Sequence, residues 1–468
     1  MTLVAGVDSS TQSVKIVVRD AETGELVREA RGSHPDATEV DPRIWWAELQ
    51  KATSGLLDGV EALSVGGQQH GMVALDSQGE PVRDALLWND TRSAQTAADL
   101  VNELGGPQAW VDAVGSVPLA AFTVSKVRWL AQHEPDLAAR VERILLPHDY
   151  LTWQLAGQSE VTTTDRGDAS GTGYWSPAAE QYRMDIFEMA FGRSVSLPTV
   201  AAPHEQVGTI AGTSIILGPG TGDNMAAAFA LDLAPGDIAV SLGTSGTAFA
   251  RSTTPAADPS GFVAGFADAT GQFLPLVCTL NAARVLTAAA GLLDMDMETF
   301  AQAALAAPPG AEGLTVLPYL DGERTPNLPD AAGTLAGIRR SNLTPQNLAR
   351  AAVEGMMCGL ADAVDALIAV GVTPRRVMLI GGAAANPAVA EVAATLFDVP
   401  VVVPAPGEYV ADGAARQAAW VLSGESEPPH WAGAVSGAPE FTGVRVAQVR
   451  DQYRSARLAM HPESERLA

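Results

Sequence analysis

Cysteine and lysine are both scarce in this sequence. The 468 residues include two cysteines, which excludes a disulfide framework and a four-cysteine zinc site. Lysine occurs only at Lys15, Lys51 and Lys126. No Gly-Lys-Ser/Thr tripeptide is present, so the sequence lacks a phosphate loop of the Walker A type. The Val-Ala-Ile-Lys context of protein kinases and the Gly-x-Gly-x-x-Gly dinucleotide fingerprint are missing as well.

Net positive charge and long apolar runs are also lacking. The 29 Lys and Arg residues are outnumbered by 54 Asp and Glu residues, which gives a formal net charge of −25. Such a surface repels nucleic-acid phosphates, so we expect no nucleic-acid partner. No run of about 18 predominantly apolar residues occurs, so we expect no membrane partner. The start, Met1 to Asp8, does not resemble a signal peptide, and together with the few cysteines this predicts a cytoplasmic protein.

Apolar residues, by contrast, are plentiful at 47% of the chain. Because single cores stop growing at about 250–300 residues, this length predicts two domains. Alternating strand and helix patterns predict an α/β fold, in which mixed sheets are covered by helices. Strands are expected at residues 3–7, 14–19, 26–30, 377–380 and 401–403. Helices are expected from Asp41 and Pro42 onward, from Thr344 to about 369, at 387–397 and in the tail near 446–460, with a loop at 423–439.

A strand–turn–strand pattern occurs twice in the chain. Aligning the segment Asp8-Ser-Ser-Thr-Gln-Ser13 with Ser241-Leu-Gly-Thr-Ser-Gly246 places Thr11 opposite Thr244. The offset is about half the chain, which indicates one fold unit that occurs twice. A chance likeness of two turns rich in Ser, Thr and Gly is the alternative.

Both turns have the composition of a phosphate loop. Small hydroxyl side chains and free amides can form an anion site, and the carboxylate of Asp8 can hold Mg²⁺ directly or through water. Lys15 would add a positive charge near the phosphate. In the second turn, Gly243 and Gly246 let the backbone approach a ligand closely around Thr244 and Ser245. An ordinary β-turn and a glycine-rich hairpin remain the alternative interpretations.

Three further segments carry candidate ligand contacts. Gly381-Gly382-Ala383 follows an expected strand and precedes Asn386, so a flat adenine and ribose could lie on its backbone. Asp223, beside Asn224, is either a helix cap or a base that accepts the proton of a substrate hydroxyl. The cluster Gln68-Gln69-His70 either stabilises a buried turn or contacts a hydroxylated ligand.

Together these segments resemble the FGGY carbohydrate kinases, a family of the actin-like ATPase superfold. The resemblance runs from Leu3 to about Leu422. The segment from Thr123 to His133 is similar to the first family signature, with Ala121 as a departure at its leading position. The segment from Gly333 to Glu354 meets the second signature fully. Ser10 is another departure, because many relatives have glycine in the first phosphate turn.

The resemblance implies roles for individual residues. Asp223 looks like the catalytic base, with Asp8 as the second catalytic carboxylate and the Mg²⁺ ligand. Gln69, His70, Asp223 and Asn224 would bind the sugar, and the Gly-Gln-x-His-Gly pattern points within the family to kinases of D-xylulose. The residues expected at ATP are Thr11, Lys15, Gly243, Thr244, Ser245, Gly382, Ala383 and Asn386. A kinase of another ketose or polyol, such as ribulose, and a non-catalytic protein that binds ATP and sugar remain alternatives.

The resemblance also implies a domain organisation. A sugar-binding actin-like domain is expected at residues 1–236 and a nucleotide-binding actin-like domain at 237–424. Residues 425–468 would form a loop and a helix packed on the body. The family fold implies an ATP and sugar cleft between the domains, and it leaves a homodimer open.

Overall fold

The computed structural model describes residues 1–431 and 435–467. These residues form two compact units. Unit 1 comprises residues 1–233, 253–274 and 407–431, and unit 2 comprises 234–252, 275–406 and 435–467. Segments 253–274 and 407–424, which the sequence division assigned to the second domain, therefore pack within unit 1.

The sheet of unit 1 is mixed and has β1 (Leu3–Ser9) near its middle. Strand β1 pairs antiparallel with β2 (Ser13–Asp20), which pairs antiparallel with β3 (Leu26–Ser33). On its other side β1 lies parallel to β5 (Val60–Gly67). The order continues to β14 (Ile216–Leu217) and β13 (Gly208–Thr209), and the short β15 (Thr221–Gly222) pairs parallel with the end of β5. The N-terminal strands and the α/β class predicted from the sequence are confirmed.

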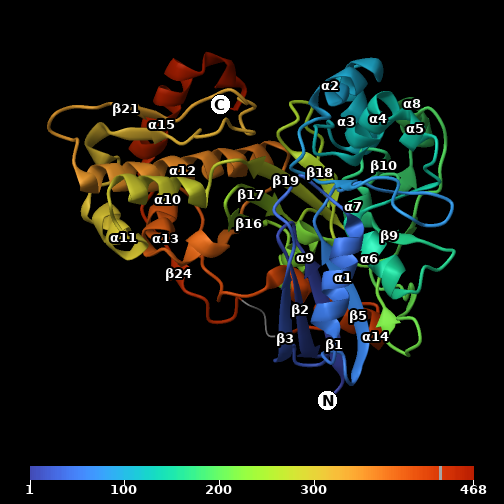
Figure 1. The fold of residues 1–468 in the computed structure, drawn as a ribbon. Helices are drawn as coiled ribbons and strands as arrows, with labels where there is room; N and C mark the ends of the chain where they lie inside the picture. Colours follow the sequence, from blue (N-terminus) through green and yellow to red (C-terminus); the bar gives the residue numbers. More distant parts are fainter. Residues whose placement is uncertain (432–434, 468) are drawn as a thin grey trace. The chain divides into compact units, whose positions relative to one another are not determined.

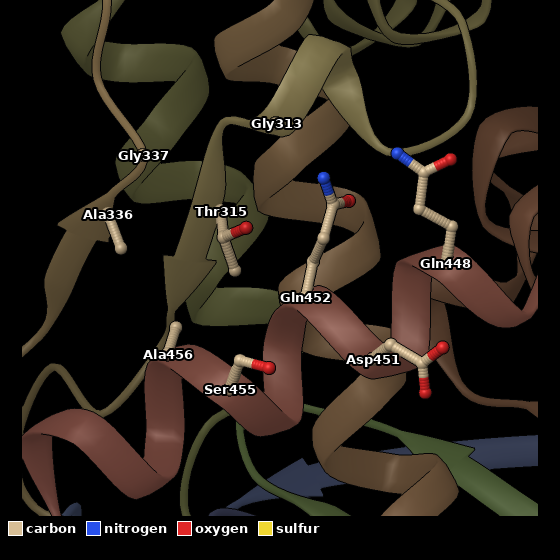
Figure 2. A pocket seen from close by; sticks show the side chains of 9 residues that line it. All are labelled: Gly313, Thr315, Ala336, Gly337, Gln448, Asp451, Gln452, Ser455 and Ala456. Atoms are coloured by element: carbon tan, nitrogen blue, oxygen red, sulfur yellow. The ribbon is translucent and has the colours of Figure 1, made fainter.

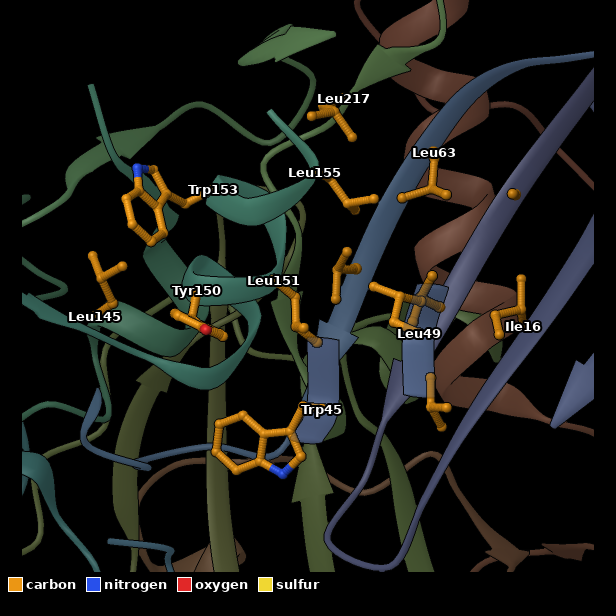
Figure 3. Packing of buried hydrophobic residues seen from close by; sticks show 14 of the residues in the cluster. Ile16, Trp45, Leu49, Leu63, Leu145, Tyr150, Leu151, Trp153, Leu155 and Leu217 are labelled. Atoms are coloured by element: carbon orange, nitrogen blue, oxygen red, sulfur yellow. The ribbon is translucent and has the colours of Figure 1, made fainter. Parts of the chain in front are cut away.

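One face of this sheet carries a large apolar core (Figure 3). Alternation along β1 turns Leu3, Ala5 and Val7 toward this core. Helices α1 (Pro42–Thr53) and α6 (Pro147–Leu155) cover the face with large side chains. Asp41 caps α1 as predicted, because its carboxylate accepts the Arg43 backbone N–H at 3.0 Å.

The opposite face is covered by α14 (Tyr409–Ser423), drawn in orange-red in Figure 1. The approach is close because Gly6 of β1 lacks a side chain: a Cβ there would lie 1.9 Å from the Ala411 carbonyl oxygen. On its other side α14 contacts α9 (Asp223–Ala230), and a Cβ at Gly413 would lie 1.9 Å from the Ala226 carbonyl oxygen. Small residues thus bring α9 and its first residue, Asp223, near the sheet.

Unit 2 repeats the same strand pattern. Strand β16 (Asp237–Leu242) pairs antiparallel with β17 (Gly246–Ala250), which pairs antiparallel with β19 (Phe273–Thr279). On its other side β16 lies parallel to β22 (Arg376–Ile380), followed by β23 (Val401–Val402) and β24 (Glu440–Phe441). The order β19-β17-β16-β22-β23 matches β3-β2-β1-β5-β14 of unit 1. The predicted repeat of one fold unit is therefore confirmed.

Helices pack around the second sheet. The longest described helix, α12 (Pro345–Ala369), contacts β17, α10 (Ala283–Leu292), α11 (Met297–Ala306) and α13 (Pro387–Ala394), as Figure 1 shows. Its predicted start is confirmed, because Thr344 accepts the Asn347 backbone N–H at 3.2 Å. The helix predicted at 387–397 is too long: it ends at Ala394, where the Thr395 hydroxyl donates back to the Val392 carbonyl at 2.7 Å.

The C-terminal helix α15 (Ala447–Met460) confirms the helix predicted in the tail. It is fastened to α12 by buried ion pairs: Asp362 contacts both Arg450, at 2.8 Å, and Arg457. The Tyr453 and Tyr319 hydroxyls hydrogen-bond at 3.1 Å. The loop predicted at 423–439 lies partly outside the described residues, and β24 begins directly after it.

The remaining elements are short or lie outside the two sheets. In unit 1 they are β4 (Glu39–Val40), β6 (Val73–Leu75), β7 (Ala85–Leu86), α2 (Ala94–Glu103), α3 (Pro107–Val114), α4 (Thr123–His133), α5 (Pro135–Ala138), β8 (Arg143–Leu145), β9 (Thr163–Asp165), α7 (Arg166–Ala169), β10 (Trp175–Ser176), β11 (Gln181–Tyr182), α8 (Met184–Phe191), β12 (Thr199–Ala201), β13 (Gly208–Thr209) and β18 (Ala264–Ala267). In unit 2 they are β20 (Thr315–Leu317), β21 (Thr334–Ala336) and the 3-10 helices η1 (Ala311–Gly313), η2 (Gly382–Ala385) and η3 (Pro462–Leu467).

Candidate active site

The ends of three neighbouring strands bring the two predicted catalytic carboxylates to one edge of the unit 1 sheet. Asp8 of β1 and Thr221 of β15 both lie beside Gly66 of β5 in the strand register. Asp223 follows β15 directly, as the first residue of α9. Adjacent strands are about 4.8 Å apart, so the chain segments of Asp8 and Asp223 lie within about two strand spacings of each other.

Asp8 is buried and held by neighbours of both charges. Its carboxylate accepts the Ser10 hydroxyl at 2.5 Å, and its Oδ2 lies 3.6 Å from Lys15 Nζ. Burial is the largest influence on Asp8 and raises its pKa, while Ser10 and Lys15 lower it in part. Ser10, which stands where many relatives have glycine, therefore donates a hydrogen bond to the Asp8 carboxylate in this chain.

Lys15, the predicted phosphate contact, pairs with two carboxylates of unit 1. Its Nζ lies 2.6 Å from a carboxylate oxygen of Glu408, just before α14, in addition to its contact with Asp8. Glu408 also accepts from Arg31 at 3.0 Å. Lys15 thus partly neutralises two carboxylates, and a phosphate would have to compete with both for its charge.

Thr11 is held in place by two side chains from other segments. Its hydroxyl donates to Gln68 Oε1 at 3.3 Å and accepts from Trp88 Nε1 at 2.9 Å. Trp88 is a contact that the sequence analysis did not identify. Its indole N–H can only donate a hydrogen bond, but Trp88 stands 77 residues from Thr11 in the chain, so no local sequence pattern connects the two residues.

Gln69 and Asn224 form one polar cluster beside Asp223. Asn224 Nδ2 donates to Gln69 Oε1 at 3.1 Å and to Asp223 Oδ1 at 2.9 Å. Among the residues that the structure describes, Gln69 Nε2 has no hydrogen-bond partner although it is buried. A buried donor without a partner is costly, and a hydroxylated ligand would satisfy it.

His70 lies in a strained backbone position next to this cluster. Its φ of 67° is unusual for a residue with a side chain. Its ring stacks on Phe122 with centroids 5.0 Å apart, and its Nδ1 donates to the Gly171 carbonyl at 2.8 Å. The bond to Gly171 places the proton on Nδ1, so that Nε2 can accept a hydrogen bond from a ligand hydroxyl while the ring is neutral.

Asp223 has the electrostatic properties of a proton acceptor near neutral pH. Burial, followed by the negative charge of Asp8, raises its pKa to about 7, and the charge of Asp168 acts in the same direction. The backbone N–H and side-chain amide of Asn224 donate to it and limit the increase. A carboxylate with such a pKa is close to the optimum for general acid–base catalysis at pH 7.

Thr11 and Lys15 belong to unit 1, and the other residues predicted at the nucleotide lie in unit 2, around the turn after β16 and the loop after β22. Gly243, Thr244 and Ser245 connect β16 to β17, and the Thr244 carbonyl accepts the Ala282 backbone N–H at 3.3 Å. The loop after β22 approaches this turn, because a Cβ at Gly381 would meet Leu242 at 2.9 Å. The structure therefore brings the glycine loop and the second turn together.

The loop after β22 contains the other predicted adenosine contacts. Gly382 and Ala383 form the first turn of η2, and Gly382 is exposed with no atom near its Cβ position. Asn386 caps α13, because its Oδ1 accepts the Ala388 backbone N–H at 3.0 Å. Its side-chain amide group stays available as a hydrogen-bond donor, so one residue can serve as helix cap and as ligand contact.

A buried ionic cluster behind the Asp223 loop was missed by sequence reasoning. His148 Nδ1 lies 2.8 Å from Asp168 Oδ2, and its Nε2 lies 3.2 Å from Asp149 and 3.7 Å from Asp165. Burial alone would lower the pKa of His148, but the three carboxylates raise it to about 9. The sequence carries only a weak signal for it, namely the Asp residues on both sides of Arg166-Gly167.

A groove of about 550 Å³ in unit 2 lies apart from these residues. It runs between α15 and the strands β20 and β21 (Figure 2). Its lining consists of Gly313, Thr315, Ala336, Gly337, Gln448, Asp451, Gln452, Ser455 and Ala456. None of the predicted site residues lines this groove.

The residues present fit a metal ion that arrives with phosphates better than a permanent metal centre. Within residues 1–431 and 435–467, no group of three or more His, Cys, Asp or Glu side chains is arranged to hold a metal. Asp8 supplies one carboxylate at the edge of the sheet. Mg²⁺ commonly uses one or two carboxylates, substrate phosphates and water, so Asp8 would suffice.

Comparison with known proteins places the chain in a family. Residues 3–230 match the model of the N-terminal domain of the FGGY family of carbohydrate kinases, and residues 238–422 match its C-terminal domain. The xylulose kinase of Streptomyces coelicolor is 46% identical over 438 residues, which cover 90% of this chain and 89% of that protein. Among the described residues, no helix has the length and apolarity needed to cross a membrane.

Solved structures agree with this placement. The crystal structure of xylulose kinase from Bifidobacterium adolescentis superposes with a TM-score of 0.90 at 45% identity, covering 97% of this chain and 99% of that one. The gluconate kinase of Lactobacillus acidophilus has a TM-score of 0.88 at 21% identity with full coverage of both chains, so it shows the fold alone. Both domain models and these likenesses span nearly all of the sequence, and the chain belongs to the FGGY family of carbohydrate kinases.

Proposed function

We propose that this kinase transfers the γ-phosphoryl group of ATP to the 5-hydroxyl of D-xylulose, which yields D-xylulose 5-phosphate and ADP. The observation that carries the proposal is the cluster of Asp223, Asn224 and Gln69, with a carboxylate of pKa about 7 and an unpaired amide donor. Relatives at 45–46% identity that are named xylulose kinases support the choice of sugar. The fold does not support it, since a gluconate kinase shares that fold.

Asp223 acts as the general base in this proposal. Its carboxylate accepts the proton of the 5-hydroxyl while that oxygen bonds to the γ-phosphorus and the bond from phosphorus to ADP breaks. Asn224 holds the carboxylate through two hydrogen bonds, at 2.8 and 2.9 Å. The Gln69 amide donor and His70 Nε2 bind other hydroxyls of the sugar, which orients the 5-hydroxyl toward the base.

The nucleotide is assigned to the turns and the glycine loop. Backbone amides of Gly243, Thr244 and Ser245 would bind its phosphates, and the exposed Gly382 loop would hold its adenosine. Thr11 and Lys15 would contribute from the first turn, and Asp8 would hold Mg²⁺. When bound, Mg²⁺ neutralises phosphate charge in a chain whose net charge is −25. We place the reaction in the cytoplasm on the basis of the cysteine content, and a homodimer stays a prediction.

A panel of sugars tests the proposal. ADP release would be measured with D-xylulose, ribulose, other pentuloses, gluconate and polyols, each with ATP and Mg²⁺. We expect the highest kcat/KM with D-xylulose. A clearly higher value for another sugar would assign a different substrate within the family, and binding of ATP and sugar without turnover would identify a non-catalytic member.

A further inference from the structure

A buried ionic cluster lies directly behind the site, and the proposed chemistry does not use it. His148, Asp149 and Asp168 are fully or almost fully buried, and Asp165 is only 2% exposed. Three carboxyl groups surround one imidazole, and burial raises the pKa of Asp149 to about 7, so the cluster buries ionisable groups that an apolar core would not contain. Burying charge is costly, and replacing such a cluster with apolar residues is often neutral or stabilising. Stability alone therefore does not explain the cluster.

One branch of the cluster reaches the loop that carries Asp223. Asp165 Oδ2 accepts the Thr221 hydroxyl at 2.7 Å, two residues before Asp223. His148 packs against the same loop, because a Cβ at Gly220 would lie 2.5 Å from its Cδ2. The carboxylate of Asp165 is itself held in place, because the backbone N–H groups of Gly167 and Asp168 donate to it at 2.8 and 2.9 Å.

A second branch reaches His70. Asp168, paired with His148, belongs to α7, and its carbonyl accepts the Gly171 backbone N–H at 2.9 Å. The Gly171 carbonyl in turn accepts from His70 Nδ1 at 2.8 Å. A Cβ at Gly171 would lie 2.6 Å from the His70 ring, so this contact leaves the ring little freedom. One short segment, residues 165–171, therefore contacts both the base-carrying loop and the predicted sugar-binding histidine.

We propose that Thr221, Asp165, Asp168 and His148 are positioning residues, which hold the Asp223 loop and the His70 ring in fixed positions for the sugar. This inference rests on the proposed function, because it assumes that Asp223 and His70 act on the same substrate. None of the four residues needs to touch the sugar. The high pKa of His148, about 9, keeps it positively charged at neutral pH and so supports its role as the central ion of the cluster.

Thr221→Val and Thr221→Ser form a matched pair for the first branch. Valine keeps the shape of threonine but removes the hydroxyl bonded to Asp165, whereas serine keeps the hydroxyl. We expect Thr221→Val to lose at least fivefold in kcat while the KM for ATP stays within twofold, and Thr221→Ser to lose less than twofold. Calorimetric titration with the sugar gives the fraction of folded chains, by which each kcat is divided. A corrected loss below fivefold in the valine variant, or equal losses in both variants, would overturn the inference.

Asp168→Asn tests the second branch, because the amide oxygen of asparagine can still accept a hydrogen bond from His148 Nδ1 but the side chain carries no charge. We expect a KM for the sugar raised at least threefold with an unchanged KM for ATP. A change in melting temperature alone, with both KM values unchanged, would show that the cluster is only structural. The sugar panel on the wild-type enzyme separates the two proposals: a different preferred sugar refutes the substrate assignment, and the variants are then measured with that sugar.

Discussion

Replacing Asp223 with asparagine tests the reasoning about the base most directly. Asparagine keeps the size and the hydrogen-bonding shape of the side chain, but it cannot accept the hydroxyl proton. General base catalysis by a positioned side chain contributes about 10²–10⁴ in rate. We expect Asp223→Asn to lower kcat at least about 100-fold, while sugar binding by calorimetry persists because Gln69 and His70 remain.

The pKa of Asp223 fixes the pH at which the wild-type rate should fall. A base with a pKa of about 7 is roughly 9% ionised at pH 6 and about 90% ionised at pH 8. Since only the ionised carboxylate accepts a proton, kcat/KM should rise about tenfold between these two values. A carboxylate with the ordinary pKa of 3.8 would give a flat profile over the same range.

The raised pKa of Asp223 also makes the free energy of unfolding depend on pH. The raised pKa means that the folded protein binds the proton more tightly than the unfolded chain, so stability falls as pH rises from about 4 to 7. The shift corresponds to at most about 4 kcal/mol, and less because the carboxylate is partly exposed. Asp223→Asn should therefore unfold at higher urea than the wild type at pH 8, and the difference should vanish near pH 4. A flat rate profile together with equal stabilities at pH 8 would refute the reasoning.

Three other substitutions test separate parts of the structure. Asp8→Asn should raise the Mg²⁺ concentration needed for half-maximal rate several-fold, because the ion loses its carboxylate; an unchanged Mg²⁺ titration would contradict this role. Arg457→Met should lower the free energy of unfolding by about 3 kcal/mol in urea, because Asp362 keeps only Arg450 as a partner; a loss below 1 kcal/mol would show that Arg450 is enough. Gly413→Ala should lower the melting temperature clearly although alanine is the better helix former, since its Cβ would overlap the Ala226 carbonyl; an unchanged or higher melting temperature would contradict this close contact.

Local sequence patterns predicted many of the helices and strands. The caps at Asp41 and Thr344 each use one side chain and a backbone N–H two or three residues away, so they are visible in sequence. The end of α13 was missed by three residues, because the back-bond of Thr395 competes with helix continuation and leaves little trace in a pattern of apolar residues.

Packing between segments far apart in the chain could not be predicted from these local patterns. The segment of α14 follows the second repeat in sequence, yet it packs against β1, where Gly6 leaves room for it. Nothing near Gly6 in the sequence shows which helix fills that space. The His148 cluster was missed for a related reason, since its charges are informative only once they are known to be buried together.

The repeated fold explains why chemistry and nucleotide binding were assigned to equivalent turns with different side chains. The turn after β1 carries Asp8 and lies beside the strand end that leads to Asp223, so unit 1 concentrates carboxylates. The equivalent turn after β16 carries Gly243 and Thr244 and lies beside Gly381, so unit 2 exposes backbone instead. Carboxylates serve proton transfer and Mg²⁺, whereas bare amides serve phosphate in an acidic chain. The two units therefore share one strand order, while the first turn carries a carboxylate and the second turn carries no charged side chain.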